Sequence, residues 1–176
     1  SSSINILDLL RPRGIAWAQK ALQMKKKNLK GNGVDNAVAY LYKRCDRPER
    51  EHFFRLLTSN GLGLAGRVHA LGFCNGGLNL TQQPNMVPMT DISMLTRDHE
   101  AFSHSAIEQY QSFKFVIAFE NEVLEGYITE KLSNAYFARA VPIYLGAPNV
   151  GEYFEPGSMI NCLDFDSLEE CAQVGV

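Results

Sequence analysis

A group of reactive side chains follows an apolar stretch in the segment FENEVLEGYITEK, residues 119–131. Its members are Glu120, Asn121, Glu122, Tyr127, Glu130 and Lys131. An ammonium group binds phosphate, whereas carboxylates, amides and phenols form hydrogen bonds with sugar hydroxyls or nucleobase edges. Each residue alone also has an ordinary structural role, such as capping a turn or packing in the core. Their clustering indicates a site for a nucleotide sugar or another phosphorylated ligand.

A helix is predicted over residues 129–140, because Thr129 is a favourable N-cap residue. The start of a helix presents unpaired N–H groups and a partial positive charge, and both favour an anion such as phosphate. Glu130 complements this charge or binds sugar hydroxyls. Lys131 opposes it, and such a local conflict is expected at a functional site. The alternative for Lys131 is an ordinary surface lysine.

A second cluster lies in the segment KRCDRPEREHFF, residues 43–54, which contains Arg44, Arg47 and Arg50. Pro48 and Gly61 predict a helix that begins and ends near these residues. Arg50 falls in its first turn and directly follows a predicted strand. A guanidinium group forms paired hydrogen bonds with phosphate, so Arg50 is a candidate ligand of a diphosphate. The alternative is that the three arginines form a solvated basic turn.

Short apolar segments alternate with helical patterns along the chain. The predicted strands are residues 37–43, 67–73, 114–119 and 141–146, with a further short strand at 159–165. The predicted helices are residues 48–61, 97–111 and 129–140, with a last one starting near residue 166. This alternation predicts an α/β fold with a Rossmann-like parallel sheet and helices on both faces.

Ligands of such sheets bind beyond the carboxyl ends of the strands, where both clusters fall. The fold also predicts that Phe115, Ile117, Val141 and Ile143 are buried. Residues 74–96 are rich in Gly, Asn, Gln and Pro, and are predicted to form a long loop.

Composition excludes several functional classes. The 176 residues suffice for one domain, and a net charge of −2 argues against a nucleic-acid partner. No apolar stretch is long enough to span a membrane. No GxGxxG pattern follows the first predicted strand, and the sequence contains no Walker A or GxSxG pattern, which disfavours dinucleotide, P-loop and α/β-hydrolase chemistry.

The four cysteines are Cys45, Cys74, Cys162 and Cys171, and none has the spacing of a zinc site. Disulfides are compatible with their spacing but are not required by it. The triplet Asn79-Leu80-Thr81 matches the acceptor pattern for N-glycosylation, which matters only in a secretory protein.

The segment FKFVIAFENEVLEGYITEKLSNAYFARAVPIYLGAPNVGEYFEPGSMINCLDF, residues 113–165, closely resembles the signature of the α1,3/α1,4-fucosyltransferases, glycosyltransferase family ten. The segments CDRPEREHFFRLL (45–57) and RVHALGFC (67–74) resemble the parts of that family that precede it. The resemblance covers approximately residues 37–165. Residues 1–36 carry no match and are interpreted as an N-terminal segment or linker.

This resemblance implies a GT-B enzyme, in which two Rossmann-like domains face a cleft. Residues 37–176 would be its C-terminal, GDP-fucose-binding domain, truncated at its end. The parent would transfer L-fucose from GDP-fucose to a GlcNAc- or glucose-type hydroxyl of a glycan, with inversion and without a metal cofactor. The acceptor domain, which supplies the general base, would be absent from this chain. If eukaryotic, the parent would be a type II protein of the Golgi membrane.

By the same resemblance, Arg50 and Lys131 hold the diphosphate and stabilise the leaving group. Asn121, Tyr127 and Glu130 would line the nucleotide and the fucose.

The glutamate of the family's FEN motif matches Glu120, which is also placed on the donor side. Two residues depart from the family pattern: Glu122 replaces a serine, and Gly126 replaces an acidic residue. Because Glu122 adds a carboxylate near an anionic donor, a truncated or degenerate non-catalytic nucleotide-binding module is the alternative. An unrelated Rossmann-like structural domain is a third hypothesis, disfavoured by the length of the match.

Overall fold

The computed structural model describes residues 36–59, 67–77 and 99–174. The strands are β1 (Val38–Tyr40), β2 (Val68–Ala70), β3 (Phe115–Phe119), β4 (Val141–Leu145) and β5 (Ile160–Asn161). The helices are α3 (Pro48–Thr58), α4 (His99–Tyr110), α5 (Glu130–Phe137) and α6 (Leu168–Val174). Short 3₁₀ turns lie at η3 (Val150–Glu152), η4 (Pro156–Ser158) and η5 (Cys162–Asp164).

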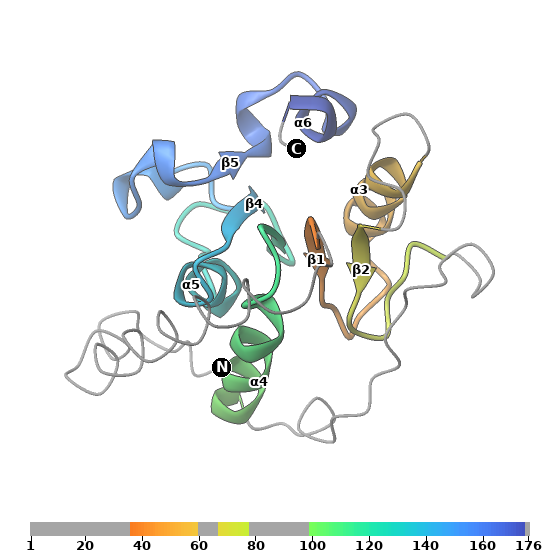
Figure 1. The fold of residues 1–176 in the computed structure, drawn as a ribbon. Helices are drawn as coiled ribbons and strands as arrows, with labels where there is room; N and C mark the ends of the chain where they lie inside the picture. Colours follow the sequence, from red (N-terminus) through yellow and green to blue (C-terminus); the bar gives the residue numbers. More distant parts are fainter. Residues whose placement is uncertain (1–35, 60–66, 78–98, 175–176) are drawn as a thin grey trace.

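These five strands form one sheet in the order β2-β1-β3-β4-β5, and every neighbouring pair is parallel (Figure 1). The longest ladder joins β3 to β4, from Phe115 opposite Val141 to Phe119 opposite Leu145. The ladder between β1 and β3 is short and includes only Val38 with Phe115 and Ala39 with Val116. The strands β1 and β3 therefore diverge toward their carboxyl ends.

Both faces of the sheet are buried, because successive strand residues belong to different core clusters. Val38, Tyr40, Ile117 and Phe119 pack with residues of α3 and α6. Ala39 and Val116 pack with residues of α4 and α5. Figure 1 shows α3 and α6 on one side of the sheet and α4 and α5 on the other. The predicted α/β sheet with helices on both faces is confirmed, as are its four main strands.

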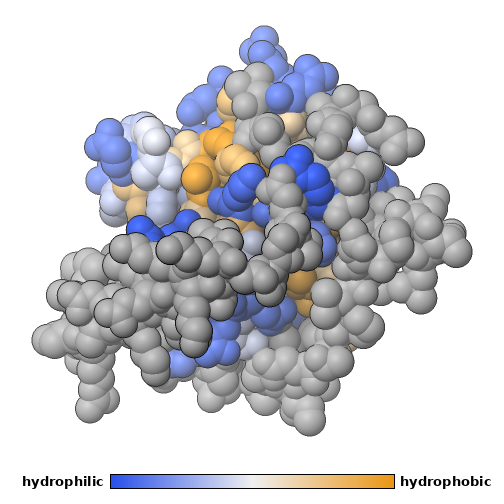
Figure 2. Space-filling view, viewed as in Figure 1, coloured by the Kyte–Doolittle hydropathy of each residue, from blue (hydrophilic) through white to orange (hydrophobic). Residues whose placement is uncertain are grey.

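Two of the predicted burials are wrong. Ile117 and Ile143 are buried, but Val141 is 40% exposed and Phe115 is only half-buried. Phe115 and Val141 are paired first residues of neighbouring strands. They lie at the amino edge of the sheet, where Phe115 packs only in part against the core cluster. Figure 2 shows hydrophobic side chains reaching the surface over β4 and β5, between hydrophilic regions.

The strand predicted at residues 159–165 is shorter than expected. Only Ile160–Asn161 pairs with β4. The chain then turns into η5, because the side chain of Asn161 accepts a hydrogen bond from the Leu163 N–H at 3.3 Å. The glycosylation triplet, the segment 1–35 and most of the predicted loop 74–96 lie outside the described residues.

Two disulfides join all four cysteines. Cys45–Cys74 ties the turn between β1 and α3 to the segment after β2, and Cys162–Cys171 ties η5 to α6. Disulfides of this kind persist in oxidising compartments.

Candidate active site at the carboxyl edge of the sheet

The sheet has a topological switch point between β1 and β3. From β1 the chain continues to β2 on one side, and then crosses to β3 on the other side. Connections that leave two neighbouring strands in opposite directions open a crevice beyond their carboxyl ends, where α/β proteins bind ligands. Arg50 comes from the helix that follows β1, and Glu120 and Asn121 directly follow β3. The two clusters predicted from the sequence therefore meet at this switch point.

Arg50 is the central cation of the site and is only 2% exposed. Its Nη2 donates to the Phe119 carbonyl at 3.0 Å and to Asn121 Oδ1 at 2.6 Å. Its guanidinium carbon lies 4.2 Å from the centre of the Tyr42 ring. Within the described part of the chain, Arg50 Nε has no hydrogen-bond partner and no carboxylate pairs with the guanidinium. A buried positive charge without a counter-ion is costly, so this arrangement favours an anionic ligand.

Asn121 connects Arg50 to Tyr127. The Asn121 amide accepts from Arg50 through Oδ1, and its Nδ2 donates to the Tyr127 hydroxyl at 3.4 Å. Tyr127 is half-buried, which leaves part of its ring accessible to a ligand.

Glu120 has a side chain with no exposed surface, and its contacts are all within the protein. Oε1 accepts from the Thr129 N–H at 2.7 Å, and Oε2 accepts from the Thr129 hydroxyl at 2.7 Å. Lys131 Nζ lies 3.3 Å from the same Oε2. Glu120 thereby joins the end of β3 to the start of α5.

The prediction that the helix begins at Thr129 is confirmed. Thr129 is the N-cap residue of α5, but its side chain makes no capping hydrogen bond to the helix. Its hydroxyl and its N–H are both occupied by Glu120. The carboxylate of Glu120 therefore already binds the N–H of Thr129. This N–H belongs to the helix start that was expected to be available to a phosphate.

Lys131 is 20% exposed at its side chain and lies between two carboxylates. Its Nζ is 3.3 Å from Glu120 Oε2 and 3.5 Å from Glu130 Oε1, and it donates to the Thr129 hydroxyl at 2.9 Å. Unlike Glu120, Glu130 retains 24% of its side-chain exposure. A ligand can therefore reach both Lys131 and Glu130 from solvent.

Arg50 and Lys131 lie on the same strand end. Arg50 contacts Phe119 and Asn121, and Lys131 contacts Glu120 between them. The arginines of the segment 43–54 do not share one environment. Arg44 is exposed and pairs with Asp46 at 2.6 Å. The interpretation as a solvated basic turn thus fits Arg44, whereas Arg50 belongs to the site.

Glu122 and Gly126 lie in the loop between β3 and α5. Glu122 is exposed, and the structure gives it no contact with either cation. Gly126 has a φ of 71°, which side chains rarely adopt. Its N–H donates to Asn149 Oδ1 at 2.9 Å, which fixes the loop to η3. The backbone conformation therefore explains why this position is a glycine.

Sequence reasoning missed Tyr42 and Gly146. Tyr42 is a buried tyrosine at the end of an apolar segment. A buried tyrosine hydroxyl usually has a hydrogen-bond partner, and this is the signal that could have identified Tyr42. At Gly146, a Cβ atom would lie 2.7 Å from Glu120 Cγ and would collide with the Tyr144 hydroxyl. Only glycine leaves room there for Glu120.

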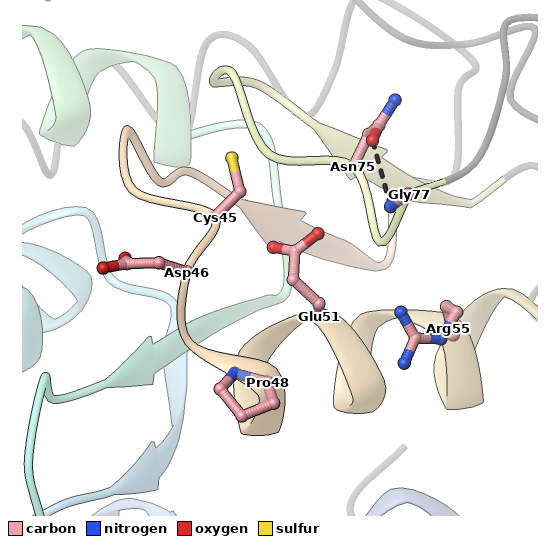
Figure 3. A pocket seen from close by; sticks show the side chains of 7 residues that line it. All are labelled: Cys45, Asp46, Pro48, Glu51, Arg55, Asn75 and Gly77. Atoms are coloured by element: carbon pink, nitrogen blue, oxygen red, sulfur yellow. Dashed lines mark hydrogen bonds between the residues drawn. The ribbon is translucent and has the colours of Figure 1, made fainter.

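A separate cavity of about 430 Å³ lies beside the first turns of α3 (Figure 3). It is lined by Cys45, Asp46, Pro48, Glu51, Arg55, Asn75 and Gly77. Glu51 accepts hydrogen bonds from Tyr40 and from the Gly76 N–H. Glu51, Cys45 and Cys74 bring their ligand atoms within 4.8 Å of one another, but the two sulfurs are joined as a disulfide. No thiolate is available there for a metal ion.

The fold and the site define a parallel α/β domain with a buried cation at its switch point, the place where nucleotide-binding domains of this kind bind their ligands. Residues 65–174 match glycosyltransferase family 10 (fucosyltransferase), C-terminal domain. The chain belongs to this family, as its signature segment predicted.

Curated relatives support this assignment. The chain is 38% identical over 109 residues to an α-(1,4)-fucosyltransferase of Arabidopsis thaliana, covering 59% of this chain and 26% of the relative. It is 35% identical over 133 residues to GDP-fucose protein O-fucosyltransferase 3 of Xenopus laevis, covering 75% and 25%. It is 43% identical over 63 residues to the α-(1,3)-fucosyltransferase FucT of Helicobacter pylori, covering 36% and 13%. The matches thus span about a quarter or less of each relative.

Solved structures share the fold. A crystal structure of an α1,3-fucosyltransferase superimposes with a TM-score of 0.61 at 24% identity, over 89% of this chain and 36% of that chain. Structures of α1,3-fucosyltransferase with GDP and with GDP-fucose give TM-scores of 0.58 and 0.57. The expected α/β, Rossmann-like fold of a GT-B fucosyltransferase is confirmed.

Proposed function

We propose that residues 37–176 form the domain that binds GDP-fucose in a longer fucosyltransferase. The observation that carries this proposal is Arg50, a buried guanidinium at the switch point with no carboxylate partner among the described residues. A diphosphate supplies the missing negative charge, and its paired oxygens match the geometry of a guanidinium. Membership of the fucosyltransferase family supports this choice of ligand.

The two cations have different roles in the proposed site. Arg50 is held rigidly by Phe119 and Asn121, so it presents a fixed charge to the diphosphate. Lys131 is partly exposed and paired with Glu130 at 3.5 Å, so it can exchange this carboxylate for a phosphate oxygen. Together they would stabilise the departing GDP without a metal cofactor.

The neighbouring residues serve the rest of the donor. Asn121, Tyr127 and Glu130 would line the nucleotide and the fucose, since each is only partly buried and lies in the hydrogen-bond or ion-pair network of Arg50 or Lys131. Glu120 was expected on the donor side, but its side chain has no exposed surface. We assign to Glu120 the positioning of Thr129 and Lys131.

The proposed parent reaction is an inverting transfer of L-fucose to a GlcNAc- or glucose-type hydroxyl of a glycan, of the α1,3 type. The acceptor hydroxyl attacks the sugar from the face opposite the diphosphate and loses its proton to a general base. Glu120 is occupied by Thr129 and Lys131, so it is not that base. We propose that a separate acceptor domain of the parent supplies the base, and that this chain alone does not transfer fucose. General base catalysis is worth about 10²–10⁴-fold.

A non-catalytic nucleotide-binding module is the second candidate. The observation that favours it is the position of Lys131 between Glu120 and Glu130, since these carboxylates compete with a phosphate. Binding and transfer measurements separate the two candidates.

The proposed place of the parent is a Golgi membrane if the organism is eukaryotic. The two disulfides support an oxidising compartment. None of the helices in the described ranges combines the length and the hydropathy of a membrane span. Residues 1–36 remain assigned to an N-terminal segment or linker.

Calorimetric titration of the chain with GDP, GMP and UDP tests the binding proposal. GDP should bind more tightly than GMP, because the second phosphate adds contacts to Arg50 and Lys131. Replacing Arg50 by Lys keeps the charge but removes the paired hydrogen bonds, and should weaken GDP binding at least tenfold. The exposed Arg44→Lys variant is the matched control and should bind GDP unchanged. Equal GDP affinity in both variants would refute the proposal.

Radiolabelled fucose transfer to a lactosamine acceptor tests the catalytic part. The isolated chain should show only slow hydrolysis of GDP-fucose, whereas the full-length parent should transfer. Robust transfer by the isolated chain would place the base within these 176 residues. A parent that binds GDP-fucose without transferring it would favour the non-catalytic module.

A further inference from the structure

Tyr42 packs against Arg50, the residue proposed to bind the diphosphate. The guanidinium carbon of Arg50 is 4.2 Å from the centre of the Tyr42 ring, and Tyr42 is 5% exposed. A cation over an aromatic face is attracted by the ring quadrupole, and the attraction is strongest where water is excluded. The ring therefore provides Arg50 with a buried surface that is not a carboxylate and does not neutralise its charge.

The hydroxyl of Tyr42 spans the gap between β1 and β3. The backbone ladder between these strands ends at Ala39 opposite Val116. Beyond it, the Tyr42 hydroxyl accepts the Phe119 N–H at 2.7 Å and lies within donating distance of the carbonyls of Ile117 and Phe119, at 2.9 Å and 3.1 Å. One side chain thus continues the connection between the strands up to the carboxyl edge.

The Phe119 carbonyl is shared by Tyr42 and Arg50. It accepts from Arg50 Nη2 at 3.0 Å and lies 3.1 Å from the Tyr42 hydroxyl. Burial raises the pKa of Tyr42 well above its usual range, so the hydroxyl remains protonated and neutral. The contacts of Arg50 are therefore with a ring, a carbonyl and an amide, all of them uncharged.

We propose that Tyr42 is the positioning residue that holds Arg50 at the switch point with its full positive charge available to the diphosphate of the donor. This inference rests on the proposed function of the site. A carboxylate in the place of Tyr42 would hold the guanidinium equally well, but it would compete with the ligand. An aliphatic residue would neither attract the cation nor join β1 to β3.

The test compares Tyr42→Leu and Tyr42→Phe with Tyr40→Phe in the full chain. Tyr40 serves as the control, because it is a buried tyrosine whose hydroxyl contacts Glu51 rather than β3, and Tyr40→Phe keeps the ring that lies 4.9 Å from the Tyr42 ring. Tyr42→Leu removes the ring and should weaken GDP binding about thirtyfold, the size of a desolvated cation–π contact. Tyr42→Phe keeps the ring, so its GDP affinity should stay within about threefold of that of wild type. Tyr40→Phe loses the hydrogen bond to Glu51 and should lower stability without changing the GDP affinity of the folded protein.

A second readout does not depend on GDP. Nuclear magnetic resonance of the Arg50 guanidinium in the unliganded chain reports its rotation and hydrogen exchange. Both should be slow in wild type, in Tyr42→Phe and in Tyr40→Phe, and faster in Tyr42→Leu. Unchanged guanidinium dynamics in Tyr42→Leu would overturn the inference, even if GDP binding were lost. If wild type does not bind GDP while the dynamics change as expected, the positioning role stands and the proposed function fails.

Discussion

Arg50 and Asn121 are joined by a hydrogen bond of 2.6 Å between a guanidinium nitrogen and an amide oxygen. This bond links the helix after β1 to the loop after β3, across the switch point of the sheet. An aspartate at position 121 has nearly the same shape as asparagine and would form a salt bridge there. The protein instead places an uncharged amide beside its buried cation. We interpret this choice as the reason that the charge of Arg50 remains available to a ligand.

Asn121→Asp should therefore weaken GDP binding by at least tenfold, because the new carboxylate neutralises Arg50 and repels the diphosphate. The variant should remain folded, since the carboxylate retains the contact with Arg50. Calorimetric titration measures the affinity, and thermal unfolding measures the stability. Ser112→Asp adds the same charge at an exposed position after α4 and serves as the control. Equal affinities in the two variants would contradict the assigned role of Asn121.

Lys131→Ala should weaken GDP binding by about 1.5–3 kcal/mol, the usual scale of a charged hydrogen bond. It also leaves the buried Glu120 without its cation, so the free energy of unfolding should fall as well. Lys114 precedes β3 at the opposite edge of the sheet, and Lys114→Ala is the matched control. Calorimetric titration with GDP that gave the same affinity for both alanine variants would remove Lys131 from the site.

Gly146→Ala tests the space that Glu120 requires. The added Cβ would lie 2.7 Å from Glu120 Cγ and would also collide with the hydroxyl of Tyr144. Displacing Glu120 breaks its bonds to Thr129 and Lys131, so GDP affinity should fall together with stability. Overpacking of this kind costs about 1–3 kcal/mol. Gly157→Ala has no atom within 4 Å of its added Cβ and should behave as wild type in thermal unfolding and titration.

The sequence could predict the strands and the edge at which the site lies, because both depend on local patterns. Apolar segments defined β3 and β4, and Pro48 correctly marked the first position of α3. Parallel strands then required the residues after β1 and β3 to share one edge. Arg50 and Asn121 could therefore be expected at one place before their contact was known.

The roles of the individual residues within the site could not be predicted, because these roles depend on contacts between distant segments. Glu120 and Glu130 look alike in the sequence, yet one is wholly buried against Thr129 and the other remains exposed. Tyr42 acts on β3 through a hydrogen bond across the sheet. Likewise, four cysteines allow three pairings, and only the fold shows which cysteines are adjacent.

The two disulfides should differ in their contribution to stability. Cys45–Cys74 closes a loop of 29 residues in sequence separation, and Cys162–Cys171 closes one of 9. In the chain-entropy description, these loops correspond to about 3.6 and about 2.6 kcal/mol. Replacing both cysteines of a pair by serine and measuring chemical denaturation should therefore show the larger loss for the Cys45 pair. A larger loss for the Cys162 pair would show that loop closure does not dominate.

Alkaline pH should destabilise the protein through its buried tyrosines. Burial raises the pKa of Tyr144 to about 12 and raises that of Tyr42 and Tyr110 well above the usual value near 10. The folded state therefore retains protons that the unfolded chain loses above pH 10. The stability from these groups is fully present below about pH 10 and is lost as pH rises toward 12 and beyond.

Tyr110→Phe isolates one such group, because phenylalanine has no proton to lose. Each buried neutral tyrosine lowers the free energy of unfolding by about 1.4 kcal/mol per pH unit above pH 10. Tyr110→Phe should therefore have a shallower loss of stability between pH 10 and 12 than wild type, by about that slope. Tyr153 is 61% exposed, and Tyr153→Phe should follow wild type. Chemical denaturation at several pH values measures the slopes, and identical slopes for Tyr110→Phe and wild type would show that the phenol of Tyr110 ionises in the folded protein as easily as in the unfolded chain.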